Sequence, residues 1–167
     1  KKLKLSDLKG KGVVKKIIEK YLLGVYVIRS GGSLLYSFKI DESINNDLIC
    51  QFVAALSMFG EENVGKISSI MIKGLDVKMK IVAKHDLILV ILFHAGMVQD
   101  YLEDEAEKGL DRFYKKFKTH LEKDKLNQAL YERFDKDLWK IIQQYLVRIG
   151  VLREVIGVST DLDFVIG

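Results

Sequence analysis

The chain has 167 residues, 49% of them apolar and 30% charged, which suits one globular domain with a core of its own. Its longest strongly apolar run, "LILVILF" at 87–93, is far shorter than the roughly 20 residues that cross a bilayer, which argues against a membrane span. The single cysteine, Cys50, excludes an internal disulfide and predicts a reduced, cytoplasmic protein.

Charge is distributed unevenly along the chain. Residues 1–20 contain eight lysines against Asp7 and Glu19, whereas the other 147 residues carry 19 basic and 21 acidic side chains. The nearly neutral body argues against a nucleic-acid-binding surface, and we expect no nucleic acid as a partner. The basic leader predicts contact with an anionic surface, such as a peripheral membrane contact. The candidate residues for that contact are Lys1, Lys2, Lys4, Lys9 and Lys11.

The first elements are a lysine-rich amphipathic helix at 13–22 and two strand-like runs at 24–30 and 33–39. Gly31 and Gly32 lie between the two runs, in "YVIRSGGSLLYSF". A phosphate-binding loop would lead from a strand into a helix, with a lysine and a hydroxyl at fixed offsets. Because "LLYSF" follows the glycines, the pattern instead predicts a hairpin with a type I′ turn.

The remaining elements follow from periodicity and from turn residues. A helix is expected at about 43–59, capped by Asp41 or Ser43. Three strands are expected next, within 66–74, 76–85 and 86–96, followed by long helices at about 98–123 and 125–149. The predicted organisation is a basic helical segment at 1–22, a domain at 23–150, and an apolar tail or added strand at 151–167.

The sequence offers little that predicts chemistry. His85, His94 and His120 have no metal-binding spacing, and no motif of a hydrolase or of a nucleotide-binding loop occurs. His85 and Asp86 could be read as a base and its orienting acid, but adjacent turn residues rarely point at one site. We therefore expect no enzyme, no catalytic residue, no metal and no cofactor.

The helix at 43–59 carries few charges. One face has Leu48, Phe52, Leu56 and Phe59 and is the expected core face, while the opposite face is small and neutral. Such a face is typical of a surface that another chain covers, although the N-terminal helix or the tail could cover it instead. The uncharged strand "KISSIMI" is also suited to pairing. The interface candidates are Asn46, Cys50, Val53, Ala54, Ser57, Ile67, Ser69 and Met71.

The order ββαβββαα, together with "GVYVIRSGGSLLYS" and "HDLILVILFHAG", resembles the longin and roadblock group of domains. In that group the first hairpin carries a V-x-x-x-x-G-x-L-L pattern, matched here by Val27, Gly32, Leu34 and Leu35. The leading helix is similar to roadblock proteins and the two trailing helices to longins. The resemblance covers about 23–150 and implies an α+β fold: a five-stranded antiparallel sheet with one helix on one face and two long helices on the other.

The resemblance also implies a non-enzymatic role. Longin and roadblock domains are platforms for small GTPases and subunits of trafficking complexes, and they dimerise through the first long helix and the third strand. We therefore expect an interaction module that pairs with itself or a related chain and regulates a small GTPase. The alternative is a PAS-like small-molecule sensor with its pocket beside Phe52 and Tyr36, and a basic arm that binds nucleic acid is a weaker one.

Overall fold

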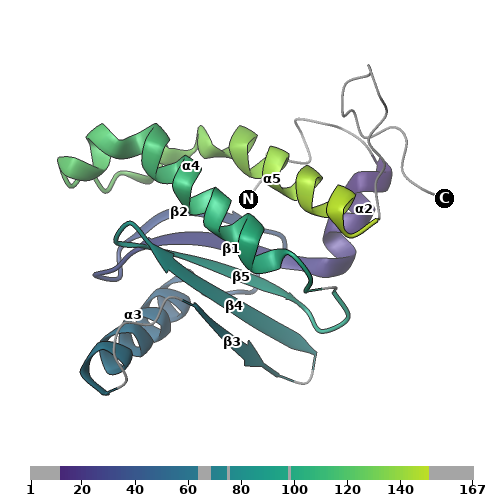
Figure 1. Cartoon of the computed structure of the whole chain (residues 1–167), viewed down its shortest axis with the longest axis horizontal. Helices are drawn as coiled ribbons and strands as arrows, with labels where there is room; N and C mark the ends of the chain where they lie inside the picture. Colours follow the sequence, from purple (N-terminus) through teal and green to yellow (C-terminus); the bar gives the residue numbers. More distant parts are fainter. Residues whose placement is uncertain (1–11, 64–68, 75, 98, 151–167) are drawn as a thin grey trace.

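The computed structural model describes residues 12–63, 69–74, 76–97 and 99–150. These form one five-stranded antiparallel sheet with helices on both faces, which confirms the expected α+β fold (Figure 1). The elements are α2 (Gly12–Tyr21), β1 (Leu22–Arg29), β2 (Leu34–Lys39), α3 (Asn46–Asn63), β3 (Ser69–Lys73), β4 (Val77–Lys84), β5 (Leu87–His94), α4 (Leu102–Glu122), the 3₁₀ turn η1 (Gln128–Tyr131) and α5 (Phe134–Arg148).

The sheet has the strand order β2-β1-β5-β4-β3, so the two ends of the sheet are β2 and β3. β1 and β5 lie in the middle, with Val25 opposite Ile91 and Tyr26 opposite Val90. Both strands are buried almost along their whole length. Their unbroken apolar runs are explained by this position, because a central strand covered on both faces has no solvent side.

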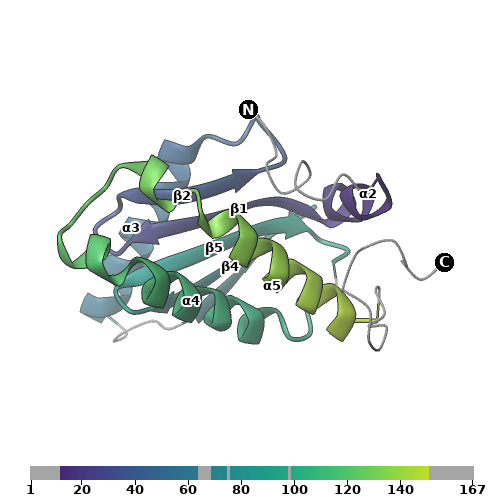
Figure 2. The same cartoon turned by 90° about the horizontal axis from the view of Figure 1, so that it is seen from above.

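The helices divide into two layers around the sheet. α3 covers one face, while α4 and α5 lie side by side over the other, and α2 lies at one end (Figures 1 and 2). The core accordingly has two parts. The larger part lies under α4 and α5 and includes Phe93, Phe113 and Phe117. The smaller part lies under α3 and includes Tyr26 and Val53.

The hairpin between β1 and β2 forms as expected, but its turn is not type I′. Gly32 donates from its backbone N–H to the Arg29 carbonyl at 2.7 Å, and Arg29 donates to the Ser33 carbonyl at 2.8 Å. Gly32 has a φ of 105°, and Gly31 is not in the positive-φ region. The loop is therefore a three-residue turn that ends in a glycine of positive φ. In the β4–β5 turn, by contrast, both His85 and Asp86 have positive φ.

The C-terminal region differs from the expected single helix at 125–149. Asn127 accepts a hydrogen bond from the Ala129 N–H at 2.9 Å and starts η1, and α5 begins only at Phe134. The short turn buries Tyr131 against Phe113 and Phe117, with ring centroids 5.4 and 5.0 Å apart. The apolar pattern of the sequence is continuous and predicts one helix, but packing of Tyr131 into this aromatic cluster breaks the helix at η1. The tail at 151–167 and the leader at 1–11 lie outside the described residues.

Candidate interaction surface

α3 starts from a polar turn that the sequence partly indicates. The side chain of Asn45 accepts a hydrogen bond from the Leu48 N–H at 3.1 Å, so Asn45, and neither Asp41 nor Ser43, caps the helix. Asp41 and Ser43 instead organise the preceding turn, where the N–H and hydroxyl of Ser43 both donate to Asp41. These hydrogen bonds from Ser43 hold the pKa of Asp41 below its usual range.

α3 faces the sheet with the side opposite to the expected one. Val53 has no exposed surface and Cys50 is 7% exposed, because both pack against the sheet. The expected core residues Leu48, Phe52 and Phe59 are 61, 45 and 59% exposed. The assignment of Cys50 and Val53 to an intermolecular interface is therefore wrong, since this chain's own sheet covers them.

Side-chain size explains the reversal. The side of α3 that has Cys50, Val53 and Ala54 is small and lets the helix approach the sheet closely. Ala54 lies beside the hairpin turn, where a Cβ added to Gly32 would come within 3.4 Å of its methyl group. Of the bulky apolar side chains, Ile49 and the expected core residue Leu56 are partly buried against the core under α3, whereas the others remain on the outside. We call the exposed set Leu48, Phe52, Met58 and Phe59 the outer face of α3.

The other interface candidates are divided between two sides of the sheet. Asn46, Ala54 and Ser57 on α3 are half-buried. Ser69 and Met71 of β3 are also half-buried but lie on the α4 side. Ile67 and the leader residues Lys1, Lys2, Lys4, Lys9 and Lys11 lie outside the described residues. The candidates on α3 and the two described on β3 therefore do not form one continuous side-chain surface.

A polar network fixes the β3 edge of the sheet to α4. The Lys80 ammonium is 2.6 Å from a Glu103 carboxylate oxygen and 3.0 Å from the Ser69 hydroxyl, which itself donates to Glu103 at 2.9 Å. Lys80 is 8% exposed, an unusual position for a lysine. The hydrogen bonds from Lys80 and Ser69 hold the pKa of Glu103 below its usual range. No sequence pattern pointed to this network, because its members lie far apart in the chain.

The three histidines do not converge. His85 contacts Asp111 at 2.7 Å, not its neighbour Asp86, and its ring stacks on Tyr114 with centroids 4.4 Å apart. This hydrogen bond, with a further contribution from Lys84, lowers the pKa of Asp111. Among the described residues no group of three His, Cys, Asp or Glu side chains could hold a metal ion. Nor does any described helix combine the length and apolarity needed to cross a membrane.

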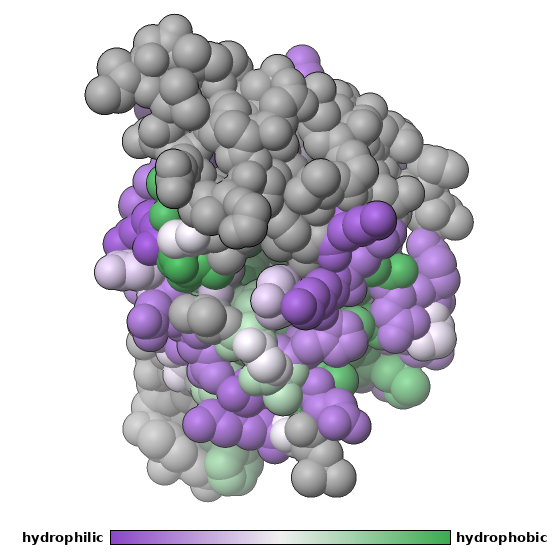
Figure 3. Space-filling model, turned by 90° about the vertical axis from the view of Figure 1, so that its right-hand side faces the viewer, coloured by the Kyte–Doolittle hydropathy of each residue, from purple (hydrophilic) through white to green (hydrophobic). Residues whose placement is uncertain are grey.

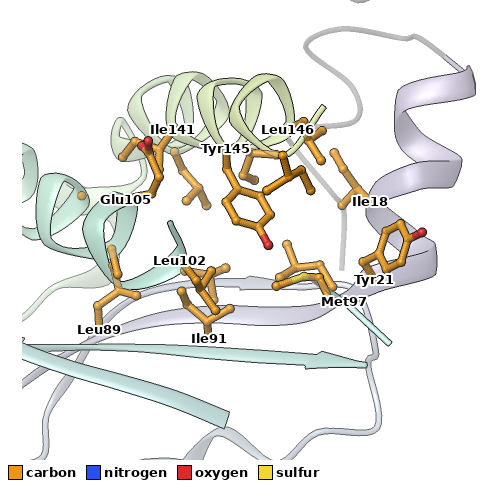
Figure 4. A pocket seen from close by; sticks show the side chains of 17 residues that line it. Ile18, Tyr21, Leu89, Ile91, Met97, Leu102, Glu105, Ile141, Tyr145 and Leu146 are labelled. Atoms are coloured by element: carbon orange, nitrogen blue, oxygen red, sulfur yellow. The ribbon is translucent and has the colours of Figure 1, made fainter. Parts of the chain in front are cut away.

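An apolar cavity of about 110 Å³ lies between α2, α4, α5 and the sheet (Figure 4). Tyr145 extends from α5 into it, and Met97 and Leu102 lie opposite. Drug-sized ligands occupy pockets of roughly 300–1,000 Å³, so this cavity suits at most a molecule of benzene size. Among the described residues no pocket is lined by both Phe52 and Tyr36, since Phe52 is on the outer face of α3 and Tyr36 lies under α5.

Gly109 gives a test of packing around this cavity. It lies inside α4, where an added Cβ would be 3.4 Å from the Ile141 and Leu89 methyl groups, an ordinary contact distance. Because alanine favours the helix by about 0.8–1 kcal/mol over glycine, we expect Gly109→Ala to raise the free energy of unfolding by about that amount. Urea denaturation of both proteins measures the change. A lower stability in the variant would mean that α4 and α5 lie too close together for the methyl group.

Figure 3 views the molecule from the end at which α2 lies. There hydrophobic residues form separate areas among hydrophilic ones (Figure 3). The exposed large apolar side chains of the described chain are Leu48, Phe52, Met58, Phe59, Val77, Tyr101 and Leu126, and four of these seven belong to α3. Such clustering on one helix is typical of an interaction site.

Comparison with known proteins supports the longin/roadblock-like fold. MglB of Myxococcus xanthus matches with a TM-score of 0.50 and 15% identity over 70% of this chain and 84% of MglB. The Roadblock/LC7 domain from Streptomyces avermitilis has a TM-score of 0.47 and 10% identity, over 64% of this chain and 92% of that one. No protein-family model matches the chain, and no curated protein matches it significantly.

Proposed function

We propose that this longin/roadblock-like chain is a non-enzymatic interaction module, which pairs through the outer face of α3 and docks or regulates a small GTPase. The observation that carries the proposal is the exposure of Leu48, Phe52 and Met58 at 61, 45 and 61% along one helix. Leaving this apolar surface in water is unfavourable by roughly 25 cal/mol per Å². A second copy, or a related chain that brings its own α3, would remove the surface from water.

The β3 edge adds to this pairing surface. β3 pairs with β4 alone in the described chain, so its other side presents backbone donors and acceptors. The Lys80–Glu103–Ser69 network holds this edge in place against α4. Two copies could therefore join through strand pairing at β3 as well as through apolar contact at α3.

The GTPase part of the proposal is supported by the resemblance to longin and roadblock domains, whose members act as platforms for small GTPases. The sensor alternative has less support, because Phe52 and Tyr36 lie on different sides of the sheet and do not line a common pocket, and the apolar cavity under α5 is too small for most ligands. The direct experiment is capture from lysate of the source cell with immobilised protein, in the presence of GDP or of a non-hydrolysable GTP analogue. A small GTPase retained in one nucleotide state supports the proposal, and its absence from both contradicts the GTPase part.

Phe52→Glu tests the pairing surface. Because Phe52 is 45% exposed in the monomer, the change is expected to leave folding intact. It would place a charge in the apolar contact, and loss of a central aromatic anchor costs about 2 kcal/mol or more, a rise of about 30-fold in the dimer dissociation constant. Sedimentation velocity over a dilution series measures that constant.

The matched control is Lys115→Glu, an exposed substitution on α4 that adds negative charge away from α3. It is expected to sediment like the unmodified protein. Equal dissociation constants for the unmodified chain and Phe52→Glu would exclude the outer face of α3 as the pairing surface. If the unmodified chain is monomeric at the highest concentration measured, self-pairing is excluded, and a related chain remains as the pairing partner.

A further inference from the structure

A groove of about 490 Å³ lies along the seam between α4 and α5, which are side by side (Figure 2). Arg148 at the end of α5 is 2.6 Å from Asp104 at the start of α4. Lys116, late in α4, is 2.7 Å from Asp137, early in α5. The two helices are therefore antiparallel, and an ion pair joins them on each side of the groove.

Between these two ion pairs the seam carries positive charge on both helices. Arg112 of α4 and Lys140 of α5 line the groove from its two sides, and both are exposed. Each lies about one helical turn inward from the Lys116–Asp137 pair, so the two cations face each other. Neither forms an ion pair or hydrogen bond with any described residue. Because facing like charges repel, this position favours a ligand that brings an anion.

The rest of the lining leaves this positive charge uncompensated. Lys108 adds a third cation one turn before Arg112, and it lies 3.6 Å from both Asp104 and Glu105. Among the described lining residues Glu105 is the one carboxylate, and Arg148 already neutralises it at 2.7 Å. The groove thus has free cations and no free carboxylate in the described part of the chain.

The floor of the groove is apolar. Ile141 and Val147 are half-buried there, and a Cβ added to Gly109 of α4 would be 3.4 Å from the Ile141 methyl group. Ile141 therefore crosses the bottom of the seam, below the exposed cations. A flat lipid surface would meet the cations without reaching this floor. A segment with an apolar stripe between two rows of carboxylates would contact both.

We propose that the α4–α5 groove binds an acidic amphipathic helix of a partner protein. Its apolar stripe lies on Ile141 and Val147. Carboxylates on one flank of the stripe meet Arg112 and those on the other flank meet Lys140, as e and g positions lie on opposite sides of the a and d positions of a heptad. The site is on the opposite face of the sheet from α3 (Figure 1), and its binding depends on neither the proposed pairing nor the GTPase function.

The test is titration of the isotope-labelled full chain with a synthetic peptide of two heptads, about 14 residues, with leucine at a and d and glutamate at e and g. Backbone amide shifts in the NMR spectrum locate the binding. We expect the largest changes at Lys108, Arg112, Lys140 and Gln144, and an affinity that falls as salt is raised. A matched peptide with lysine at e and g should not bind.

Arg112→Glu distinguishes this site from general attraction to the basic chain. The substitution turns two facing cations into an opposite-charge pair, so the variant is expected to fold at least as stably as the unmodified chain. It should bind the glutamate peptide about tenfold more weakly, since a repulsive contact replaces an attractive one. The matched control is Lys125→Glu, which makes the same change of charge at an exposed residue beyond α4. It should bind like the unmodified chain.

Three results would overturn the proposal. The first is no binding of the glutamate peptide at about 1 mM, even if Arg112→Glu weakens binding of the chain to phosphatidylserine vesicles, since that would identify a lipid site. The second is equal affinity of Arg112→Glu and Lys125→Glu for the peptide. The third is a set of amide shifts outside α4 and α5, or equal binding of the lysine peptide, which would mean that the charges of the groove do not select the ligand.

Discussion

Val53→Glu is expected to destabilise the monomer strongly rather than only to separate two subunits. Val53 has no exposed surface and lies in the core layer between α3 and the sheet, which includes Tyr26, Ile88 and Val90. A carboxylate there would lose its hydration without gaining a partner, at a cost of about 3–5 kcal/mol. Because a domain of this size is stable by about 5–15 kcal/mol, the change removes a large part of the total.

The neighbouring substitution Phe52→Glu is the matched control, since it places the same charge one residue away on the outer face of α3. Its free energy of unfolding should stay within about 0.5 kcal/mol of the unmodified chain. Urea denaturation followed by circular dichroism measures both variants. If Val53→Glu proved stable and Phe52→Glu unfolded, α3 would have to face the sheet with its bulky side, as its sequence pattern alone suggests.

The side of α3 that packs against the sheet could not be predicted from the sequence. Periodicity correctly predicted a helix and correctly found apolar residues on more than one side of it. It could not decide which side faces the sheet, because the choice depends on how closely the helix approaches. The small side, with Cys50, Val53 and Ala54, allows that approach, and the packing energy gained over the whole helix outweighs the exposure of Phe52 and Leu48.

The sheet was easier to predict because its signals are local. The runs in β1 and β5 are apolar on both faces, and only a central strand satisfies that pattern. Gly31 and Gly32 fixed the position of the first hairpin. The expected type I′ turn was wrong, because the turn type depends on whether one or both glycines adopt positive φ. Of the two glycines, Gly32 alone does so.

Contacts between distant elements could not be predicted from the sequence. Arg148 on α5 lies in no sequence motif that distinguishes it from the other arginines of the chain. In the structure its guanidinium is 2.6 Å from Asp104 and 2.7 Å from Glu105, and it lies over the Tyr101 ring with a centroid distance of 4.2 Å. Arg148 thereby joins the end of α5 to the beginning of α4. The hydrogen bond from Arg148 holds the pKa of Asp104 below its usual range.

Arg148→Met is expected to lower the free energy of unfolding by about 2–3 kcal/mol. Glu105 is only 3% exposed, and without the guanidinium its carboxylate would keep one cationic neighbour in the described part of the chain, Lys108, at 3.6 Å. Removing one partner of a buried ion pair is costly because the other charge stays buried without compensation. Methionine preserves much of the side-chain length, so the measured loss reports mainly on charge. Urea denaturation at neutral pH gives the value.

A double-mutant cycle with Glu105→Gln distinguishes this ion pair from general packing. Glu105→Gln alone should cost about 1 kcal/mol, because Arg148 keeps Asp104 at 2.6 Å as a partner. In the double variant no buried charge remains, and its loss should be smaller than the sum of the two single losses by at least about 1 kcal/mol. Additive losses would mean that Arg148 stabilises the α4–α5 junction through its contact with Tyr101 and through Asp104, and that the buried carboxylate of Glu105 does not depend on it.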